Sequence, residues 1–212
     1  AFCATALLII ILRPLALWLG LVDVPNSRKS HSGQIPLIGG IAIFSAMLLS
    51  LLGHLFYSGS SSFADPSLYF ILGGLLLIIC GVWDDFVDLS AYSRFGTQII
   101  AALMMIYGGN VVLTDLGEIN PLGGTFQLGY MSVPFTIFAT LGIINAVNMC
   151  DGLDGLSGSL SLVSLLGLGA ANIFWGNTDP VIGVMAASIC AFLLFNMRTI
   201  WRKKAWVFLG DA

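Results

Sequence analysis

Long apolar segments alternate with short polar ones along the chain. Seven apolar segments cover residues 2–21, 35–56, 67–83, 96–108, 131–147, 158–175 and 180–197. An eighth is expected to begin near Ala205. A helix needs about 20 apolar residues to cross a bilayer, so segments 96–108 and 131–147 are short and need support from neighbouring helices. The pattern predicts an all-α, polytopic transmembrane helix bundle of about eight spans.

The composition indicates the same environment. The chain is 58% hydrophobic and 9% charged, whereas a soluble domain has about 25% charged residues. Its mean hydropathy is +0.97. We expect residues 1–212 to form a single membrane-embedded domain. The chain opens on an apolar run without a Met and stops within a motif at Ala212, so we also expect it to be truncated at both ends.

Lys and Arg residues mark one side of the predicted bundle. If the segments span in turn, the loops at 22–34, 84–95, 148–157 and 198–204 share one side of the membrane. These loops hold all of the eight basic residues except Arg13, and the loops on the other side hold none. Because cytoplasmic loops carry the excess of Lys and Arg, we predict that this side is cytoplasmic.

The outer loop at 109–130 has a strand-like pattern. Apolar and polar residues alternate over 125–130, after the turn-forming pairs Asn120-Pro121 and Gly123-Gly124. Alternation that follows such turn residues is typical of a hairpin. We predict a short β-hairpin on the outer face.

Acidic residues gather on the predicted cytoplasmic side. The first group is Asp84, Asp85 and Asp88, at the end of an apolar segment. Adjacent helical residues point about 100° apart, so Asp84 and Asp85 either have different tasks or the helix ends there. A solvated helix end is the plainer interpretation of this group. Carboxylates at a membrane edge are costly, however, unless they are hydrated, paired or bound to a metal ion.

A second polar group covers residues 145–156. If this stretch is helical, Asn145, Asn148, Asp151 and Asp154 recur every third residue along one side. The stripe would offer amide and carboxylate oxygens, which are the ligands that Mg²⁺ prefers. The alternative is a polar joint between a helix and a loop.

Cationic residues and one further acid lie on the same side. Lys29 and His31 are in the first cytoplasmic loop, Arg94 follows the first acidic group, and Asp211 is near the end of the chain. Cations on this face suit a phosphorylated ligand, although the same residues also fix the topology. Together with the acidic groups they predict magnesium-dependent phosphoryl transfer, in which metal and cationic side chains neutralise the charge on phosphate.

These residues occur in the order of four known motifs. Residues 22–40, the Asp84-Asp85 pair, residues 145–156 and Gly210-Asp211-Ala212 resemble the cytoplasmic motifs of the polyprenyl-phosphate N-acetylhexosamine-1-phosphate transferases. The resemblance covers the whole chain. It implies transfer of N-acetylhexosamine 1-phosphate, foremost GlcNAc 1-phosphate, from a UDP-sugar to undecaprenyl phosphate, with release of UMP. The product would start cell-envelope polysaccharides such as lipopolysaccharide or teichoic acid.

The resemblance also implies roles for single residues. Asn148 and Asp211 match residues implicated in binding Mg²⁺, with Mn²⁺ as the alternative cofactor. The implied catalytic residues are Asp84, Asp85 and Asp151. The implied substrate-binding residues are Asp154, Asn145, Arg94, Lys29 and His31. Among them, Asp154 is placed to meet uracil, and Arg94 to contact the diphosphate.

The implied partners are a UDP-N-acetylhexosamine, undecaprenyl phosphate and the lipid bilayer, with no nucleic acid; a homodimer is compatible with this expectation. The implied location is the bacterial inner membrane, with the active site on its cytoplasmic face. The I-P-L-I-G-G form of residues 35–40 favours the N-acetylglucosamine-type enzymes over phospho-MurNAc-pentapeptide transferases, which stay an alternative. A cation-coupled transporter is the alternative from another class, although transporters place their binding sites near the bilayer midplane.

Overall fold

The computed structural model describes residues 1–23, 33–58, 65–118, 123–198 and 204–211, and these residues are mostly helical. Lys29 and His31, which the sequence assigns to substrate binding, lie outside them. The helices of the described part are α1 (Phe2–Leu19), α2 (Gly39–Ser58), α3 (Asp65–Val87), α4 (Ala91–Leu103), α5 (Ser132–Cys150), α6 (Leu156–Phe174) and α7 (Pro180–Asn196). A π-helical turn (Met104–Gly108) extends α4, and a 3₁₀ turn (Gly129–Met131) precedes α5. Each of the seven apolar segments of the sequence therefore forms a helix.

Several of these helices suit a membrane. Four segments are long and apolar enough to cross one: Phe2–Leu19, Leu68–Val87, Gly129–Cys150 and Leu156–Phe174. Two shorter apolar helices, Gly39–His54 and Pro180–Asn196, accompany them. The structure thus confirms a helical chain with several candidate spans, but it does not confirm the predicted count of about eight.

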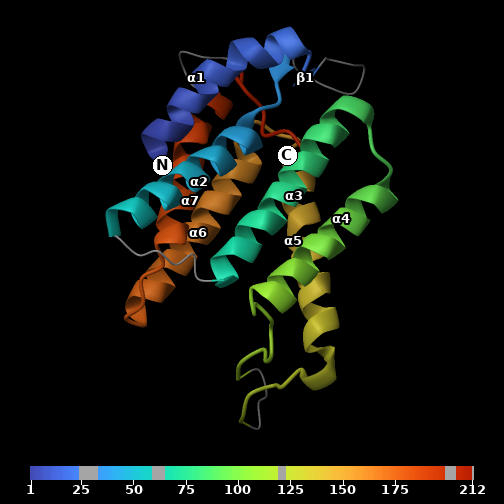
Figure 1. The fold of residues 1–212 in the computed structure, drawn as a ribbon, viewed down its shortest axis with the longest axis vertical. Coiled ribbons are helices and arrows are strands. Elements are labelled where there is room, and N and C mark those ends of the chain that lie inside the picture. Colours follow the sequence, from blue (N-terminus) through green and yellow to red (C-terminus); the bar gives the residue numbers. More distant parts are fainter. Residues whose placement is uncertain (24–32, 59–64, 119–122, 199–203, 212) are drawn as a thin grey trace.

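The helices form two groups (Figure 1). In the first group, α7 packs against α1, α2 and α6, and α1 packs against α2. In the second, α4 packs against both α3 and α5. The groups touch less extensively, through α2 with α3 and α5 with α6. The main apolar core lies in the first group, where Phe192 of α7 and Ile9 of α1 are fully buried.

The end of the chain crosses one end of the bundle as an extended segment. Within the described residues, 204–211 hold no helix, so the eighth span expected from near Ala205 is not formed there. The reason lies in partners that are distant in sequence. The amide of Phe208 donates to Pro36 O, and the amide of Gly39 donates to Phe208 O, both at 2.9 Å. The second bond satisfies an amide at the start of α2 that has no partner within that helix.

Two short antiparallel pairings lie at opposite ends of the bundle (Figure 1). β1 (Val22–Asp23) pairs with β2 (Ile35–Pro36) near the end of the chain, a sheet that the apolar pattern does not predict. At the other end, Asp115 and Gln127 form an antiparallel bridge with backbone hydrogen bonds on both sides of it. The predicted hairpin therefore exists as a short pairing without two extended strands.

Local signals in the sequence mark the end of α3 and the starts of α4 and α6. After α3, Asp88 takes a left-handed φ of 52°. Ser90 caps α4, because its Oγ accepts a hydrogen bond from the amide of Ser93 at 3.3 Å. Gly155, with a φ of 81°, precedes α6. These turns leave the α3–α4 connection at the same end of the bundle as β1 and the end of the chain (Figure 1).

Candidate functional site

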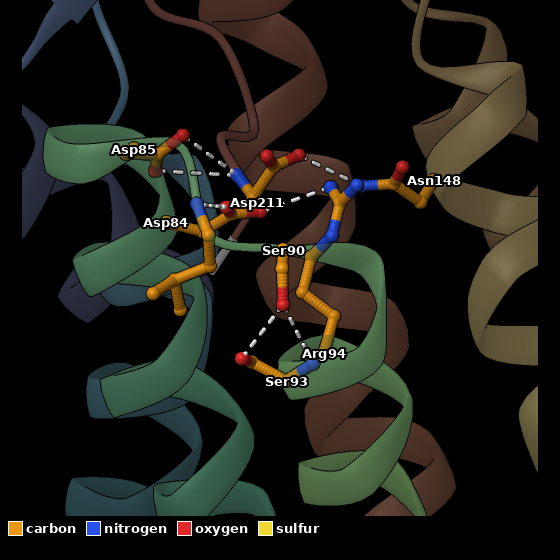
Figure 2. A network of polar contacts seen from close by, with 8 residues as sticks. Asp84, Asp85, Ser90, Ser93, Arg94, Asn148 and Asp211 are labelled. Carbon is orange, nitrogen blue, oxygen red and sulfur yellow. Dashed lines mark hydrogen bonds and ion pairs between the residues drawn. The ribbon is translucent and has the colours of Figure 1, made fainter.

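Polar side chains from separate parts of the chain meet at this end of the bundle. Asp211 lies between Asp85 of α3 and Asn148 of α5, and Arg94 of α4 reaches Asp84 (Figure 2). The contact between Asp85 and Asp211 joins residues 126 positions apart. The sequence predicts that these groups share one side of the membrane, and the fold brings all five together.

Asp84 is a buried carboxylate with two partners. Its side chain is 4% exposed. Oδ1 accepts from the amide of Leu89 at 2.6 Å, which closes the turn after α3, and Oδ2 accepts from Nη1 of Arg94 at 3.0 Å, which ties α4 to α3. Because α3 stays helical through both acids, Asp84 and Asp85 point in different directions. The helix therefore does not end at the two acids, and each carboxylate has its own partners.

Asp85 holds the backbone of the last segment. Both of its carboxylate oxygens accept from the amide of Asp211 at 3.2 Å. Gly210 permits this approach, because its φ is +81° and a Cβ there would lie 2.8 Å from Asp85 Oδ2. With its amide held in this way, Asp211 extends toward α5, where its Oδ1 accepts from Nδ2 of Asn148 at 2.8 Å.

The Asp211 carboxyl lies in an environment short of positive charge. Burial raises its pKa, and hydrogen bonding and the charge of Asp84 raise it further. The amide of Asn148 and the charge of Arg94 oppose this rise without cancelling it. A carboxyl with a raised pKa has an ionised form that its surroundings do not fully stabilise. A cation bound beside Asp211 would supply that stabilisation.

The predicted stripe of four polar residues is only half formed. Asn145 and Asn148 lie on α5, but α5 ends at Cys150, and Asp151 and Asp154 follow in a turn. Glycines within this turn favour non-helical backbone, as the positive φ before α6 demonstrates. The two acids therefore face a different space from the two amides.

The turn between α5 and α6 carries its own polar contacts. Asp151 accepts from the hydroxyl of Ser157, and Asp154 Oδ2 pairs with Nε of Arg198 at 2.5 Å. Burial is the main cause that raises the pKa of Asp151 to about 6; the Ser157 hydrogen bond opposes this rise, and the charges of Asp211 and Asp154 contribute to it. This carboxyl therefore takes up a proton at a higher pH than an ordinary aspartate does.

Two cavities meet at Asp84, Gly210 and Asp211. The first has a volume of about 360 Å³, lies between α3, α4 and α5, and has mainly apolar walls with Arg94 and Asn148 at its polar end. The second has a volume of about 590 Å³ and mainly polar walls. Its charged lining residues are Asp23, Asp84, Asp85, Asp88, Asp151, Asp154, Arg198 and Asp211. An apolar compartment and a polar one therefore share a boundary at the Asp211 carboxyl.

The donor atoms fit a metal ion that binds together with a substrate. In the described part of the chain, no three His, Cys, Asp or Glu side chains form a preformed set for a metal ion. The candidate ligands are instead the carboxylate of Asp211 and the side-chain amide of Asn148, whose Nδ2 donates to Asp211 Oδ1. Mg²⁺ commonly takes one or two carboxylates and completes its octahedron with water and substrate phosphates. This donor set fits such a magnesium ion, and it does not fit a cation held by protein alone.

Several partners of these residues are absent from the sequence motifs. Gln98, Ser157 and Arg198 hydrogen-bond to Asn145, Asp151 and Asp154 respectively. A polar residue within an apolar helical segment is a functional signal, and this signal alone could have identified Gln98. Ser157 carries no such signal. Arg198 enters the sequence analysis only as one of the basic residues that indicate which side of the membrane is cytoplasmic.

Replacing Asn145 with Ala is expected to weaken the link between α4 and α5. Its Nδ2 donates to Gln98 Oε1 at 2.7 Å and to Leu141 O at 2.8 Å, and Gln98 is buried. Losing the partner of a buried polar group costs about 1–3 kcal/mol in the free energy of unfolding. We expect a lower thermal unfolding midpoint in detergent, partly recovered when Gln98 is replaced with Leu as well. Unchanged midpoints would contradict this structural role; substrate binding by Asn145 stays a separate prediction.

Comparison with known proteins reveals similarity over the whole chain. The profile of glycosyl transferase family 4 matches residues 67–212. The chain is 42% identical over 215 residues to the undecaprenyl-phosphate alpha-N-acetylglucosaminyl 1-phosphate transferase of Haemophilus influenzae. It is 37% identical over 217 residues to the protein of the same name in Escherichia coli. It is 31% identical over 218 residues to a probable undecaprenyl-phosphate N-acetylglucosaminyl 1-phosphate transferase of Bacillus subtilis.

Each of these alignments covers 100% of this chain, but only 58%, 56% and 58% of the three relatives in that order. The chain therefore spans a little more than half the length of the curated relatives that it matches. All three relatives have an N-acetylglucosaminyl transferase name. These names favour neither the phospho-MurNAc-pentapeptide branch nor a transporter.

Proposed function

Because the chain belongs to glycosyl transferase family 4, we propose that it forms the active-site part of an enzyme that transfers GlcNAc 1-phosphate from UDP-GlcNAc to undecaprenyl phosphate. The names of the relatives support undecaprenyl phosphate as the acceptor and GlcNAc 1-phosphate as the transferred group, and UDP as its carrier follows from the resemblance of the sequence motifs. The muramyl and transporter alternatives have no such support. Lipopolysaccharide and teichoic acid stay predictions for the polymer that the product would start.

The observation that carries the proposal is the meeting of two unlike cavities at one carboxyl. The acceptor has a phosphate on a long apolar chain, which suits the cavity between α3, α4 and α5 with its polar end at Arg94. The donor has a polar nucleotide and sugar, which suit the larger polar cavity. The two phosphates that must react would then approach each other near Asp211, which borders both cavities.

The proposed reaction forms one phosphorus–oxygen bond and breaks another. An oxygen of undecaprenyl phosphate bonds to the sugar-linked phosphorus of UDP-GlcNAc, and the bond from that phosphorus to the bridging oxygen breaks. The bridging oxygen leaves with its electron pair as part of UMP. A phosphate monoester has a second pKa of about 6, so the acceptor is largely a dianion at neutral pH and needs no base to become nucleophilic.

The residues of the site would orient the phosphates and balance their charge. Asn148 and Asp211 would hold Mg²⁺, which would neutralise the charge of the diphosphate. Arg94, anchored on Asp84, would direct its guanidinium toward a phosphate oxygen. Asp85 would keep the last segment in position through the Asp211 amide. The roles of Asp151 in catalysis, of Asp154 beside uracil, and of Lys29 and His31 stay predictions.

We also propose that the site faces the cytoplasm from the bacterial inner membrane. Arg94, in the first turns of α4, and Arg198 and Lys204, after α7, lie at the site end, and the positive-inside rule favours the cytoplasm for basic residues at the ends of spans. The opposite end, with Asp115 and Asp179, has acidic residues and no described Lys or Arg. A homodimer remains an untested expectation.

The proposal is tested with the protein expressed from its complete gene and purified in detergent. We expect it to release UMP from UDP-GlcNAc only when undecaprenyl phosphate is present, and to form a lipid-linked sugar in equal amount. Chelation of divalent cations with EDTA should stop the release, and added Mg²⁺ should restore it. UDP-MurNAc-pentapeptide should give no product. Transport of a sugar or ion without release of UMP would contradict the proposal.

A further inference from the structure

A single buried amide joins two segments that border the site. Asn196 is the last residue of α7, and it is 1% exposed. Its Oδ1 accepts from the amide of Gly155 at 2.6 Å, and its Nδ2 donates to Val207 O at 2.9 Å. Both polar atoms of the side chain are thus used on backbone groups, and neither group belongs to α7.

The two backbone partners come from two of the segments that line the polar cavity and carry three of its acids. Gly155 ends the turn that holds Asp151 and Asp154, and Val207 belongs to the extended segment that ends at Asp211. Asn196 therefore fixes the spacing between the two walls of that cavity. Its two side-chain hydrogen bonds go to backbone groups and not to a carboxylate of the site, so its effect passes through the backbone of both segments.

The surroundings of Asn196 reinforce this connection. Arg198, two residues on, pairs with Asp154 at 2.5 Å, and the amide of Trp206 donates to Phe195 O at 2.8 Å. Gly155 packs so closely that a Cβ there would lie 2.7 Å from Met197. The end of α7 is therefore in contact with both segments, and Asn196 is the side chain that contacts the two at once.

We propose that Asn196 is a positioning residue that sets the distance between the Asp151–Asp154 turn and the Asp211 segment, and hence the alignment of nucleotide and metal ion. This inference rests on the proposed function for its catalytic meaning. A side chain that orients a metal ligand without touching the metal typically changes affinity or activity by about 10- to 100-fold when it is lost.

The test compares Asn196→Ala with Ser188→Ala in the complete enzyme. Ser188 is the matched control because it is fully buried on the same helix, and its hydroxyl has no hydrogen-bond partner among the described residues. For Asn196→Ala we expect kcat per folded enzyme to fall about 10- to 100-fold and the Mg²⁺ concentration for half-maximal activity to rise. Ser188→Ala should change neither value more than about twofold, since it removes no hydrogen bond.

A conservative variant separates the two bonds. Asn196→Asp keeps an acceptor for the amide of Gly155 and loses the donor to Val207 O. We expect Asn196→Ala to raise the KM for UDP-GlcNAc, and Asn196→Asp to bring this KM back toward the wild-type value while the raised Mg²⁺ requirement persists. If both variants lower only the amount of folded protein, with kcat, KM and the Mg²⁺ requirement unchanged per folded enzyme, Asn196 is merely structural and the inference is overturned.

Hydrogen exchange gives a readout that does not depend on activity. In Asn196→Ala, peptides that cover residues 151–156 and 204–211 should both exchange faster than in the wild type, and in Ser188→Ala neither should. Faster exchange in both segments of a protein that releases no UMP would uphold the connection and refute the proposed function. Unchanged exchange in either segment would overturn the inference even if the enzyme is active.

Discussion

Replacing Asp211 with Asn should lower kcat for the release of UMP by at least about 100-fold, because its carboxylate is the proposed metal ligand and even indirect partners of a metal site are worth 10- to 100-fold. Asn has nearly the same shape, and its side-chain oxygen can still accept from Asn148. The amide of residue 211 can still donate to Asp85. The substitution thus removes the negative charge and leaves these contacts. The measurement is the rate of UMP release across a Mg²⁺ titration.

Asp179→Asn is the matched control for this substitution. Asp179 lies at the N-terminus of α7, away from the site, and accepts from the amide of Val181 at 2.9 Å. Asn caps helices as well as Asp does, so kcat should change less than about twofold. If Asp211→Asn retained more than about a fifth of wild-type kcat at every Mg²⁺ concentration, the assignment of Asp211 to the metal ion would be wrong, because loss of an anionic ligand must weaken a cation site.

The positions of the helices follow from local signals in the sequence. A run of apolar residues is helical wherever it enters a membrane, because backbone groups have no other partner there. For this reason the seven apolar segments agree with α1 to α7 to within a few residues. Residues 204–211 are extended and not helical, because their backbone finds partners at the start of α2, far away in sequence. Hydropathy near Ala205 contains no information about such partners.

The sequence predicts which residues form the site better than it predicts how their side chains are arranged. The alternation of spans alone puts Asp84, Asn148 and Asp211 at one membrane surface, and the structure brings them together. The sequence does not predict the residue at which α5 ends. A helical repeat of three aligns Asp151 with Asn148 only while the helix continues, and it stops at Cys150. The fine positions of site residues depend on such helix ends and on partners such as Arg198.

Replacing Asp84 with Ala should damage both stability and activity. The amide of Leu89 would lose its acceptor; a fully buried donor without a partner costs about 1–3 kcal/mol in the free energy of unfolding, and this partly buried one should cost no more than that. Arg94 is 43% exposed, so the lost ion pair adds little, about 0–1 kcal/mol, because solvent screens it. Activity should fall further than stability predicts, since the guanidinium would no longer be held toward the phosphates. Thermal unfolding in detergent and kcat per folded enzyme measure the two effects separately.

Asp84→Asn distinguishes the causes, because an amide oxygen can still accept from Leu89 whereas its NH₂ group cannot pair with Arg94. We expect this variant to unfold near the wild-type temperature and to lose nearly as much kcat as Asp84→Ala. Arg94→Gln should then lower kcat in the wild type but have little added effect in Asp84→Asn, since residues that act through one contact are not additive. Full additivity of the two substitutions in kcat would mean that Asp84 does not act by anchoring Arg94, and the carboxylate would have to contact substrate or metal itself.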